Sequence, residues 1–239
     1  MDTVSFDPQT DPTLAANFNA ETLSLRAQNK AALQERVGLP ISPDVSLLGM
    51  VTRMDQAKGI DIALKGLRMM TKQDWQLVIL GAGDPKLESI AKKLQEDLPG
   101  RVRVETRYDA KLARQIYGGS DIFLMPSRYE PCGLSQMIAM RYGSVPLVRA
   151  VGGLHDTVTD SETGFVFVDT KVKSFNDTLR RALSLYPDRS RWMALQKADM
   201  AQDFSWTNSA RKYLELYKKL MNETTAPLRT ANNIGLRES

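Results

Sequence analysis

Cysteine and histidine are almost absent from this sequence of 239 residues, which contains one of each, Cys132 and His155. One cysteine excludes a disulfide within the chain, and this pair alone cannot supply the ligands of a conventional zinc site. A reducing compartment is therefore expected. Because no histidine lies close to Cys132 in the sequence, a thiolate mechanism is not expected. The simpler interpretation is a small buried cysteine and a surface histidine.

Long apolar runs and a strong excess of one charge are also lacking. No run approaches the roughly 20 apolar residues that a membrane span needs, and the first residues, from Met1 to Val4, do not resemble a signal peptide. Lys and Arg total 32 and Asp and Glu 28, which leaves a net charge of +4. A nucleic-acid-binding protein carries a denser basic patch. We therefore expect neither a membrane partner nor a nucleic acid.

What is present is the composition of a globular protein, with 42% hydrophobic and 25% charged residues. From residue 41 onward, short apolar runs alternate with helical patterns. Strands are predicted at 45–51, 76–80, 102–106, 121–125, 145–148 and 164–168. Helices are predicted at 60–70, 85–98, 110–117 and 134–141, and three more follow up to about residue 222. This alternation predicts an α/β fold, a Rossmann-like parallel sheet flanked by helices on both faces.

Three parts of the chain differ in pattern. Residues 1–40 form an opening segment with one leading helix at 22–37. Residues 41–222 form the α/β lobe with its C-terminal helices. Residues 223–239 are polar and are expected to be a disordered tail.

Ligands of such sheets lie at the carboxyl ends of the strands, so the residues directly after each strand carry the functional information. Arg53 and Lys58 follow the first strand, on a loop that opens a helix. Two cations at this position suit a diphosphate, which a helix N-terminus also attracts. The alternative is a pair of solvated surface cations.

The third and fourth strands are followed by an aromatic and an acidic residue. Tyr108 suits stacking on a nucleobase, or it is an aromatic at the rim. Glu130 is well placed to accept hydrogen bonds from a sugar, or it is a solvated loop charge. Pro131 and Gly133 fix the backbone and leave N–H groups of the next helix free for phosphate.

Glycine pairs after the second and fifth strands are less specific. Gly81 and Gly83 begin a dinucleotide-binding fingerprint, but its third glycine is replaced by Lys86, so NAD binding is not supported. Turn glycines are the better interpretation. Gly152 and Gly153 allow a close backbone approach to a ligand, or they form a tight turn.

Longer motifs are far more specific than these single residues. Together they resemble the glycogen/starch synthase family of bacteria and plants. The resemblance spans the chain from about Asp2 to Leu220. The segments that carry it are 126–136 (PSRYEPCGLSQ), 141–146 (RYGSVP), 152–158 (GGLHDTV), 52–59 (TRMDQAKG), 203–206 (DFSW) and 7–12 (DPQTDP).

The resemblance implies one lobe of a GT-B fold, in which two Rossmann-like lobes face each other across a cleft. The family transfers glucose from a nucleotide donor, usually ADP-glucose, to the non-reducing end of an α-1,4-glucan. It does so with retention and without a metal or other cofactor. This chain resembles the C-terminal lobe, with 1–40 as the interlobe segment and the last helix crossing back to the N-terminal lobe. The expected partners are ADP-glucose or ADP, the glucan acceptor and that missing lobe.

The same resemblance implies roles for individual residues. Arg53 and Lys58 are expected to bind the donor diphosphate and stabilise the leaving ADP, and Glu130 to face the transferred glucose. The expected substrate-binding residues are Tyr108, against the adenine, and Cys132, Gly133 and Leu134, through their backbone N–H groups. Many related transferases place a second glutamate eight residues after the first. Here Ile138 stands there, so the ribose contacts remain unassigned.

Two other functions stay open at this point. The first is another two-lobe enzyme, a sucrose-type synthase or a UDP-sugar epimerase, although Ile138 and the segment 131–134 argue against both. The second is a nucleotide-binding module that has no activity of its own, because half of the cleft is missing. The implied location is the bacterial cytoplasm, or the plastid in a plant or alga.

Overall fold

The computed structural model describes residues 1–224 and separates them into two units. The first unit extends from Met1 to Gln202 and contains the sheet. The second begins at Asp203, and its described part holds helix α9 (Trp206–Thr224). The predicted α/β architecture is therefore found within the first unit.

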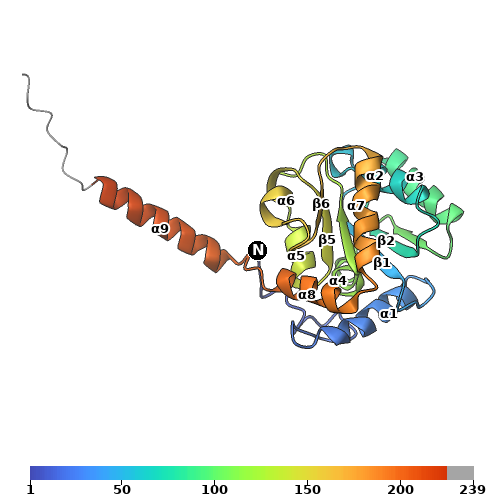
Figure 1. The fold of residues 1–239 in the computed structure, drawn as a ribbon, viewed down its shortest axis with the longest axis horizontal. Coiled ribbons are helices and arrows are strands. Elements are labelled where there is room, and N and C mark those ends of the chain that lie inside the picture. Colours follow the sequence, from blue (N-terminus) through green and yellow to red (C-terminus); the bar gives the residue numbers. More distant parts are fainter. Residues whose placement is uncertain (225–239) are drawn as a thin grey trace, which may run out of the picture. The chain divides into compact units, whose positions relative to one another are not determined.

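The sheet has six strands, all parallel, in the order β3-β2-β1-β4-β5-β6 (Figure 1). Its strands are β1 (Ser46–Val51), β2 (Trp75–Leu80), β3 (Val102–Glu105), β4 (Ile122–Met125), β5 (Val145–Arg149) and β6 (Phe165–Phe167). In the central strand, Leu48 is paired with Leu77 on one side and with Ile122 on the other. The chain winds outward in both directions from β1 and β4, so the loops after these two strands diverge and leave a crevice.

Helices cover both faces of the sheet (Figure 1). Helices α2 (Ile60–Arg68), α3 (Pro85–Asp97) and α7 (Val172–Leu185) form one layer. On the other side, α1 (Arg26–Arg36) packs on α4 (Ala110–Gly119), and α5 (Ser135–Arg141) packs on α8 (Arg189–Met200). A short helix, α6 (Gly152–Thr157), follows β5.

Apolar spacing explains why these segments are helical. In α2, Ile60, Ala63, Leu64 and Leu67 recur every three or four residues, and all four are buried against the sheet layer. Aspartates begin three of the helices, since side chains of Asp84, Asp109 and Asp188 accept hydrogen bonds from the first backbone N–H groups of α3, α4 and α8.

The opening segment is attached to this unit by buried polar contacts. The Tyr142 hydroxyl donates a 2.6 Å hydrogen bond to the Asp11 carboxylate, and Arg114 lies 3.2 Å from the same carboxylate. Burial opposes ionisation of Asp11, but these hydrogen bonds and those from Thr13 keep its pKa below the ordinary value. Arg26 donates to the carbonyl oxygens of Ser120 and Tyr142. Residues 1–40 therefore pack as part of the α/β unit.

The predicted strands and helices are confirmed, with ends that differ by a few residues. Two short elements were not predicted, α6 and a 3-10 turn at Gln56–Lys58. Helix α9 continues to Thr224, so the first two residues of the expected tail are helical. The rest of that tail, 225–239, lies outside the described residues.

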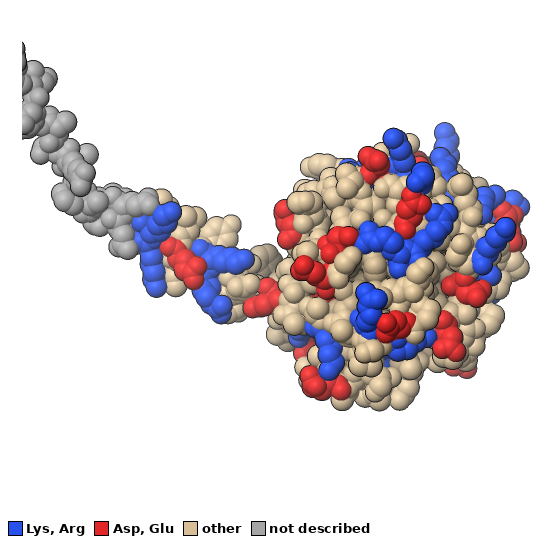
Figure 2. All heavy atoms as spheres, in the orientation of Figure 1, with Lys and Arg blue, Asp and Glu red and all other residues tan. Residues whose placement is uncertain are grey.

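Charged side chains are interspersed rather than segregated on the face that Figure 2 shows. Many form ion pairs, such as Arg181 with Asp160 at 2.8 Å and Arg68 with Asp97 at 2.7 Å. Within residues 1–224, no helix combines the length and the apolar content that crossing a membrane requires.

A buried carboxyl without a partner lies in α8. Asp199 is 1% exposed, and neither of its carboxylate oxygens has a hydrogen-bond partner within residues 1–224. Burial raises its pKa well above the ordinary value of 3.8, although the charge of Arg26 opposes this shift. The folded chain therefore keeps a proton on Asp199 that the unfolded chain has already lost. The free energy of unfolding must fall as the pH rises from 3.8 through the higher folded pKa.

We expect Asp199→Asn to stabilise the chain at pH 8, by roughly 1–3 kcal/mol, because the amide needs no proton to remain neutral. The gain is smaller at pH 5, because the cost of keeping a proton on the folded carboxyl grows as the pH rises above 3.8. Urea unfolding at both pH values, followed by circular dichroism, measures the two differences. Asp156→Asn is the control, since the Asp156 side chain is 77% exposed. A gain that is equal at both pH values contradicts the assignment.

Candidate functional site

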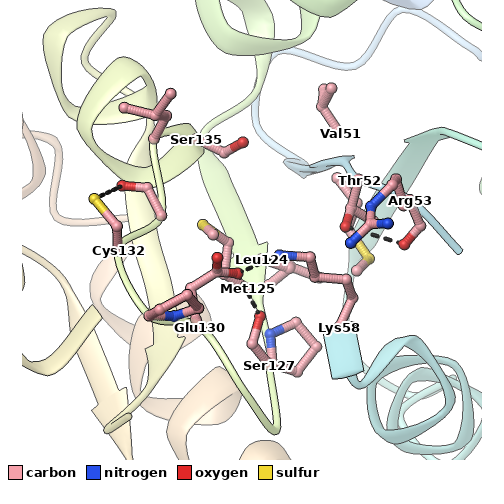
Figure 3. Close-up of a pocket in the computed structure, with 15 residues that line it drawn as sticks. Val51, Thr52, Arg53, Lys58, Leu124, Met125, Ser127, Glu130, Cys132 and Ser135 are labelled. Atoms are coloured by element: carbon pink, nitrogen blue, oxygen red, sulfur yellow. Dashed lines mark hydrogen bonds and ion pairs between the residues drawn. The ribbon is translucent and has the colours of Figure 1, made fainter. Parts of the chain in front are cut away.

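A pocket of about 400 Å³ opens at the carboxyl ends of β1 and β4, where the strand order reverses (Figure 3). Its walls come from the loop after β1, with Arg53 and Lys58, and from the loop after β4, residues 126–134, together with Ser135 at the start of α5. Six of the seven residues expected at the site line it: Arg53, Lys58, Glu130, Cys132, Gly133 and Leu134. Parallel sheets bind ligands at this position.

An ion pair joins the two loops across the pocket. Lys58 Nζ lies 2.6 Å from Glu130 Oε2, and the Ser127 hydroxyl donates to the same oxygen at 3.2 Å (Figure 3). Glu130 is only 6% exposed, so the interpretation as a solvated loop charge is wrong. Its other oxygen, Oε1, receives no hydrogen bond from residues 1–224. That oxygen is available to accept a hydrogen bond from a ligand hydroxyl.

Local backbone structure places Lys58 at the pocket. It ends the 3-10 turn Gln56–Lys58, and its N–H donates to the Asp55 carboxylate at 3.1 Å. Gly59 then turns the chain with φ of 63°, and a Cβ there would lie 2.0 Å from the carbonyl oxygen of Pro126. Only glycine permits both this conformation and this approach. The β1 loop thus packs directly on the β4 loop.

The segment from Cys132 to Leu134 is oriented by a side chain that the sequence analysis did not single out. Gln136 is fully buried in α5, and its amide nitrogen donates to the carbonyl oxygens of Cys132 at 3.2 Å and Gly133 at 2.9 Å. A trans peptide directs its C=O and the following N–H in opposite directions. The N–H groups of Gly133 and Leu134 therefore point away from Gln136.

Gly152 and Gly153 make room for protein backbone. A Cβ on Gly153 would lie 2.0 Å from the carbonyl oxygen of Cys132, and one on Gly152 would lie 2.1 Å from that of Glu130. The Gly153 N–H donates to the Glu130 carbonyl at 3.1 Å. The close approach at these glycines is therefore to the backbone of the β4 loop, whereas the sequence suggested an approach to a ligand or a tight turn.

Arg53 and Tyr108 lie at the border of the site and are highly exposed. The Arg53 side chain is 80% exposed and pairs with Asp55 at 3.4 Å. Tyr108 is 92% exposed and lines a second pocket of about 350 Å³, which shares Val51, Thr52 and Arg53 with the first. The two pockets thus meet at the end of β1. Both side chains therefore have the exposure of surface residues.

Cys132 and His155 are both on the surface. The expectation of a buried cysteine is wrong, because Cys132 is exposed in the β4 loop. His155 is a surface residue as expected, with a side chain that is 71% exposed. Within the described part of the chain, no group of three potential metal ligands lies together.

The fold and this pocket define one lobe of a GT-B glycosyltransferase. The family model for glycosyl transferases group 1 matches residues 33–197, and the chain belongs to this family. Its sequence is 47% identical, over 231 residues, to a glycogen synthase of Streptococcus pneumoniae (strain ATCC 700669 / Spain 23F-1). That match covers 93% of this chain and 48% of the relative. The chain thus spans about half the length of the curated relatives it matches.

Two solved structures have the same fold. The catalytic domain of starch synthase IV from Arabidopsis thaliana, bound to ADP and acarbose, has a TM-score of 0.85 at 37% identity. The match covers 93% of this chain and 48% of that one. A sucrose-phosphate synthase from Thermosynechococcus elongatus has a TM-score of 0.64 at 26% identity, over 81% of this chain and 49% of that one. The resemblance to glycogen and starch synthases is confirmed.

We expect Lys58→Met to lower the free energy of unfolding by about 2 kcal/mol, because it leaves the Glu130 carboxylate buried without its cation. Adding Glu130→Gln removes that charge, so the double variant is more stable than the sum of the two single effects. Urea unfolding at pH 7 measures the cycle. Lys65→Met is the control, because the Lys65 side chain is 65% exposed in its pair with Asp61. Strictly additive effects contradict a coupled pair.

Proposed function

We propose that the chain is the donor-binding lobe of a glycogen or starch synthase, which takes ADP-glucose. Together with a second lobe it transfers glucose to the non-reducing end of an α-1,4-glucan, with retention. The observation that carries this proposal is the buried Glu130 paired with Lys58 at the strand-order reversal. The likeness to a starch synthase structure that holds ADP supports the choice of nucleotide.

The leaving group decides what the residues must do. Breaking the bond between glucose and phosphate builds negative charge on ADP and positive charge on the sugar. Lys58 and Arg53 stabilise the developing charge on the diphosphate, because both cations line the pocket before the reaction starts. Glu130 faces the glucose, with Oε1 as the acceptor for a sugar hydroxyl.

The remaining contacts come from the backbone and from the second pocket. Cys132, Gly133 and Leu134 present N–H groups to the glucose and the distal phosphate. Tyr108 lies against the adenine, in the pocket that joins the first one at Arg53. The reaction as proposed needs no metal, since the two cations supply the positive charge. The acceptor glucan and the other lobe complete the cleft, so the isolated chain is expected to be inactive.

Two observations support competing functions, which the experiments below must distinguish from the proposed one. The sucrose-phosphate synthase structure has the same fold, so another two-lobe enzyme is the first alternative, and we test it with a UDP-sugar as the competing donor. A match to half of each relative leaves a nucleotide-binding module as the second alternative. Because the similar synthases come from a bacterium and a plant, we propose the bacterial cytoplasm or the plastid as its location.

We expect the chain to bind ADP in preference to UDP and NAD, and Arg53→Ala to weaken ADP binding about tenfold through the lost charged contact. Isothermal titration calorimetry with the three nucleotides measures both effects. Arg68→Ala is the matched control, because Arg68 is an exposed arginine in a single ion pair with Asp97 and does not line either pocket. A preference for UDP would favour the competing donor.

In a two-lobe enzyme that contains this chain, we expect Lys58→Ala to lower kcat by roughly a hundredfold or more. The KM for the glucan should change little, because Lys58 stabilises charge on the departing ADP. Steady-state rates with ADP-glucose and a maltooligosaccharide give the two constants. A near-normal kcat with a raised glucan KM would place Lys58 on the acceptor side instead.

A further inference from the structure

Arg149, the last residue of β5, binds the β4 loop through backbone oxygens. Its Nε donates to the carbonyl of Ser127 at 2.6 Å, and its Nη2 to that of Arg128 at 2.7 Å. Nη1 donates to the carbonyl of Val168, just after β6, at 3.3 Å. One guanidinium therefore joins two consecutive carbonyls of the β4 loop to the end of the neighbouring edge strand, β6.

The opposite side of the same two peptides is also bound. Because trans peptides direct C=O and the next N–H in opposite directions, the N–H groups of Arg128 and Tyr129 point away from Arg149. Both donate to a single acceptor, the Ala57 carbonyl, at 2.7 and 3.2 Å. The Arg128 side chain adds a hydrogen bond to the Gln56 carbonyl at 3.0 Å and a 2.6 Å ion pair with Asp61.

The two ends of this chain of contacts are adjacent to the ion pair. Ala57 directly precedes Lys58, and Tyr129 directly precedes Glu130. The orientation of the peptides after Ser127 and Arg128 therefore sets the backbone positions from which the Lys58 and Glu130 side chains extend. Arg149 touches neither Lys58 nor Glu130 in this network; it acts through the loop backbone.

We propose that Arg149 is a positioning residue that sets the separation of Lys58 and Glu130 by orienting the peptides that follow Ser127 and Arg128. That this role matters for donor binding rests on the proposed function. That Arg149 places Lys58 and Glu130 does not depend on it. A planar guanidinium is required, because its fork reaches two successive carbonyls at once. The ammonium of lysine is a point charge and cannot reproduce that geometry.

The test measures the reactivity of Lys58 in the chain without nucleotide. We expect Arg149→Lys and Arg149→Gln to raise the rate at which an acylating reagent modifies Lys58 by about threefold, since a loosened ion pair exposes the amine. Peptide mass spectrometry gives the rate, with Lys173 as the internal reference, because its side chain is 86% exposed and its partner, Asp177, lies outside this network. Circular dichroism identifies which variants keep the native fold.

The matched control is Arg101→Lys. Arg101 also joins backbone carbonyls, those of Thr71 at 3.1 Å and Gln73 at 2.8 Å, but at the amino ends of β2 and β3. It should leave the Lys58 rate unchanged. A wild-type rate in either folded Arg149 variant overturns the proposal. Loss of the fold in both variants, with a native Arg101→Lys, also overturns it, because the role would then be stability alone.

A second measurement separates this proposal from the proposed function. In calorimetry, the folded Arg149 variant should bind ADP about tenfold more weakly than the wild-type chain. The Arg101→Lys variant should bind ADP with the wild-type affinity. If the wild-type chain binds no ADP, the assigned nucleotide site fails, while the labelling rates still decide the role of Arg149. If ADP binds equally to all three while labelling rises, Arg149 positions the pair as proposed and the pair is not what binds ADP.

Discussion

The ion pair between Lys58 and Glu130 is the contact on which the rest of the site depends. It connects loops that leave two neighbouring strands in opposite directions, 72 residues apart in the chain. A carboxylate that is 6% exposed loses most of its hydration, and the fold must replace it with a cation and hydrogen bonds. Lys58 and Ser127 supply these to one oxygen and leave the other for a ligand. The fold thereby keeps a charged group at the pocket with one acceptor oxygen that receives no hydrogen bond from residues 1–224.

Backbone groups, more than side chains, fix the geometry around this pair. Arg149 and Gln136 each bind two consecutive carbonyls of the β4 loop, from different directions. The glycines at 59, 152 and 153 allow the neighbouring loops to approach the same backbone without a Cβ in the way. The loop peptides that follow Ser127, Arg128, Cys132 and Gly133 are thus oriented by a side chain, so the directions of their N–H groups are fixed. Such preorganisation lowers the cost of ordering groups around a charged ligand.

The sequence predicts the sheet well because strands buried on both faces appear as continuous apolar runs. Helix α6 gave no such signal, since it has six residues and begins with two glycines. The burial of Glu130 was not predictable, because its cation lies on a distant segment. The roles of Arg149 and Gln136 were not predictable either, for a related reason. Their partners are carbonyl groups, which every residue carries, so no side-chain pattern marks them. A polar residue within the buried face of α5 was the one available signal for Gln136.

The site therefore has a rigid part and an adjustable part. Lys58 and Glu130 are fixed by each other and by the loop backbone, whereas Arg53 and Tyr108 are 80% and 92% exposed. Ordering an exposed arginine and an exposed tyrosine on a ligand costs side-chain entropy, which reduces their net contribution to affinity. Under the proposed function, the sugar and distal phosphate meet the rigid part, and the adenine meets the adjustable part. Cleavage of the bond between glucose and phosphate then takes place among groups that are already in position. The adenine contributes affinity at the border of the pocket.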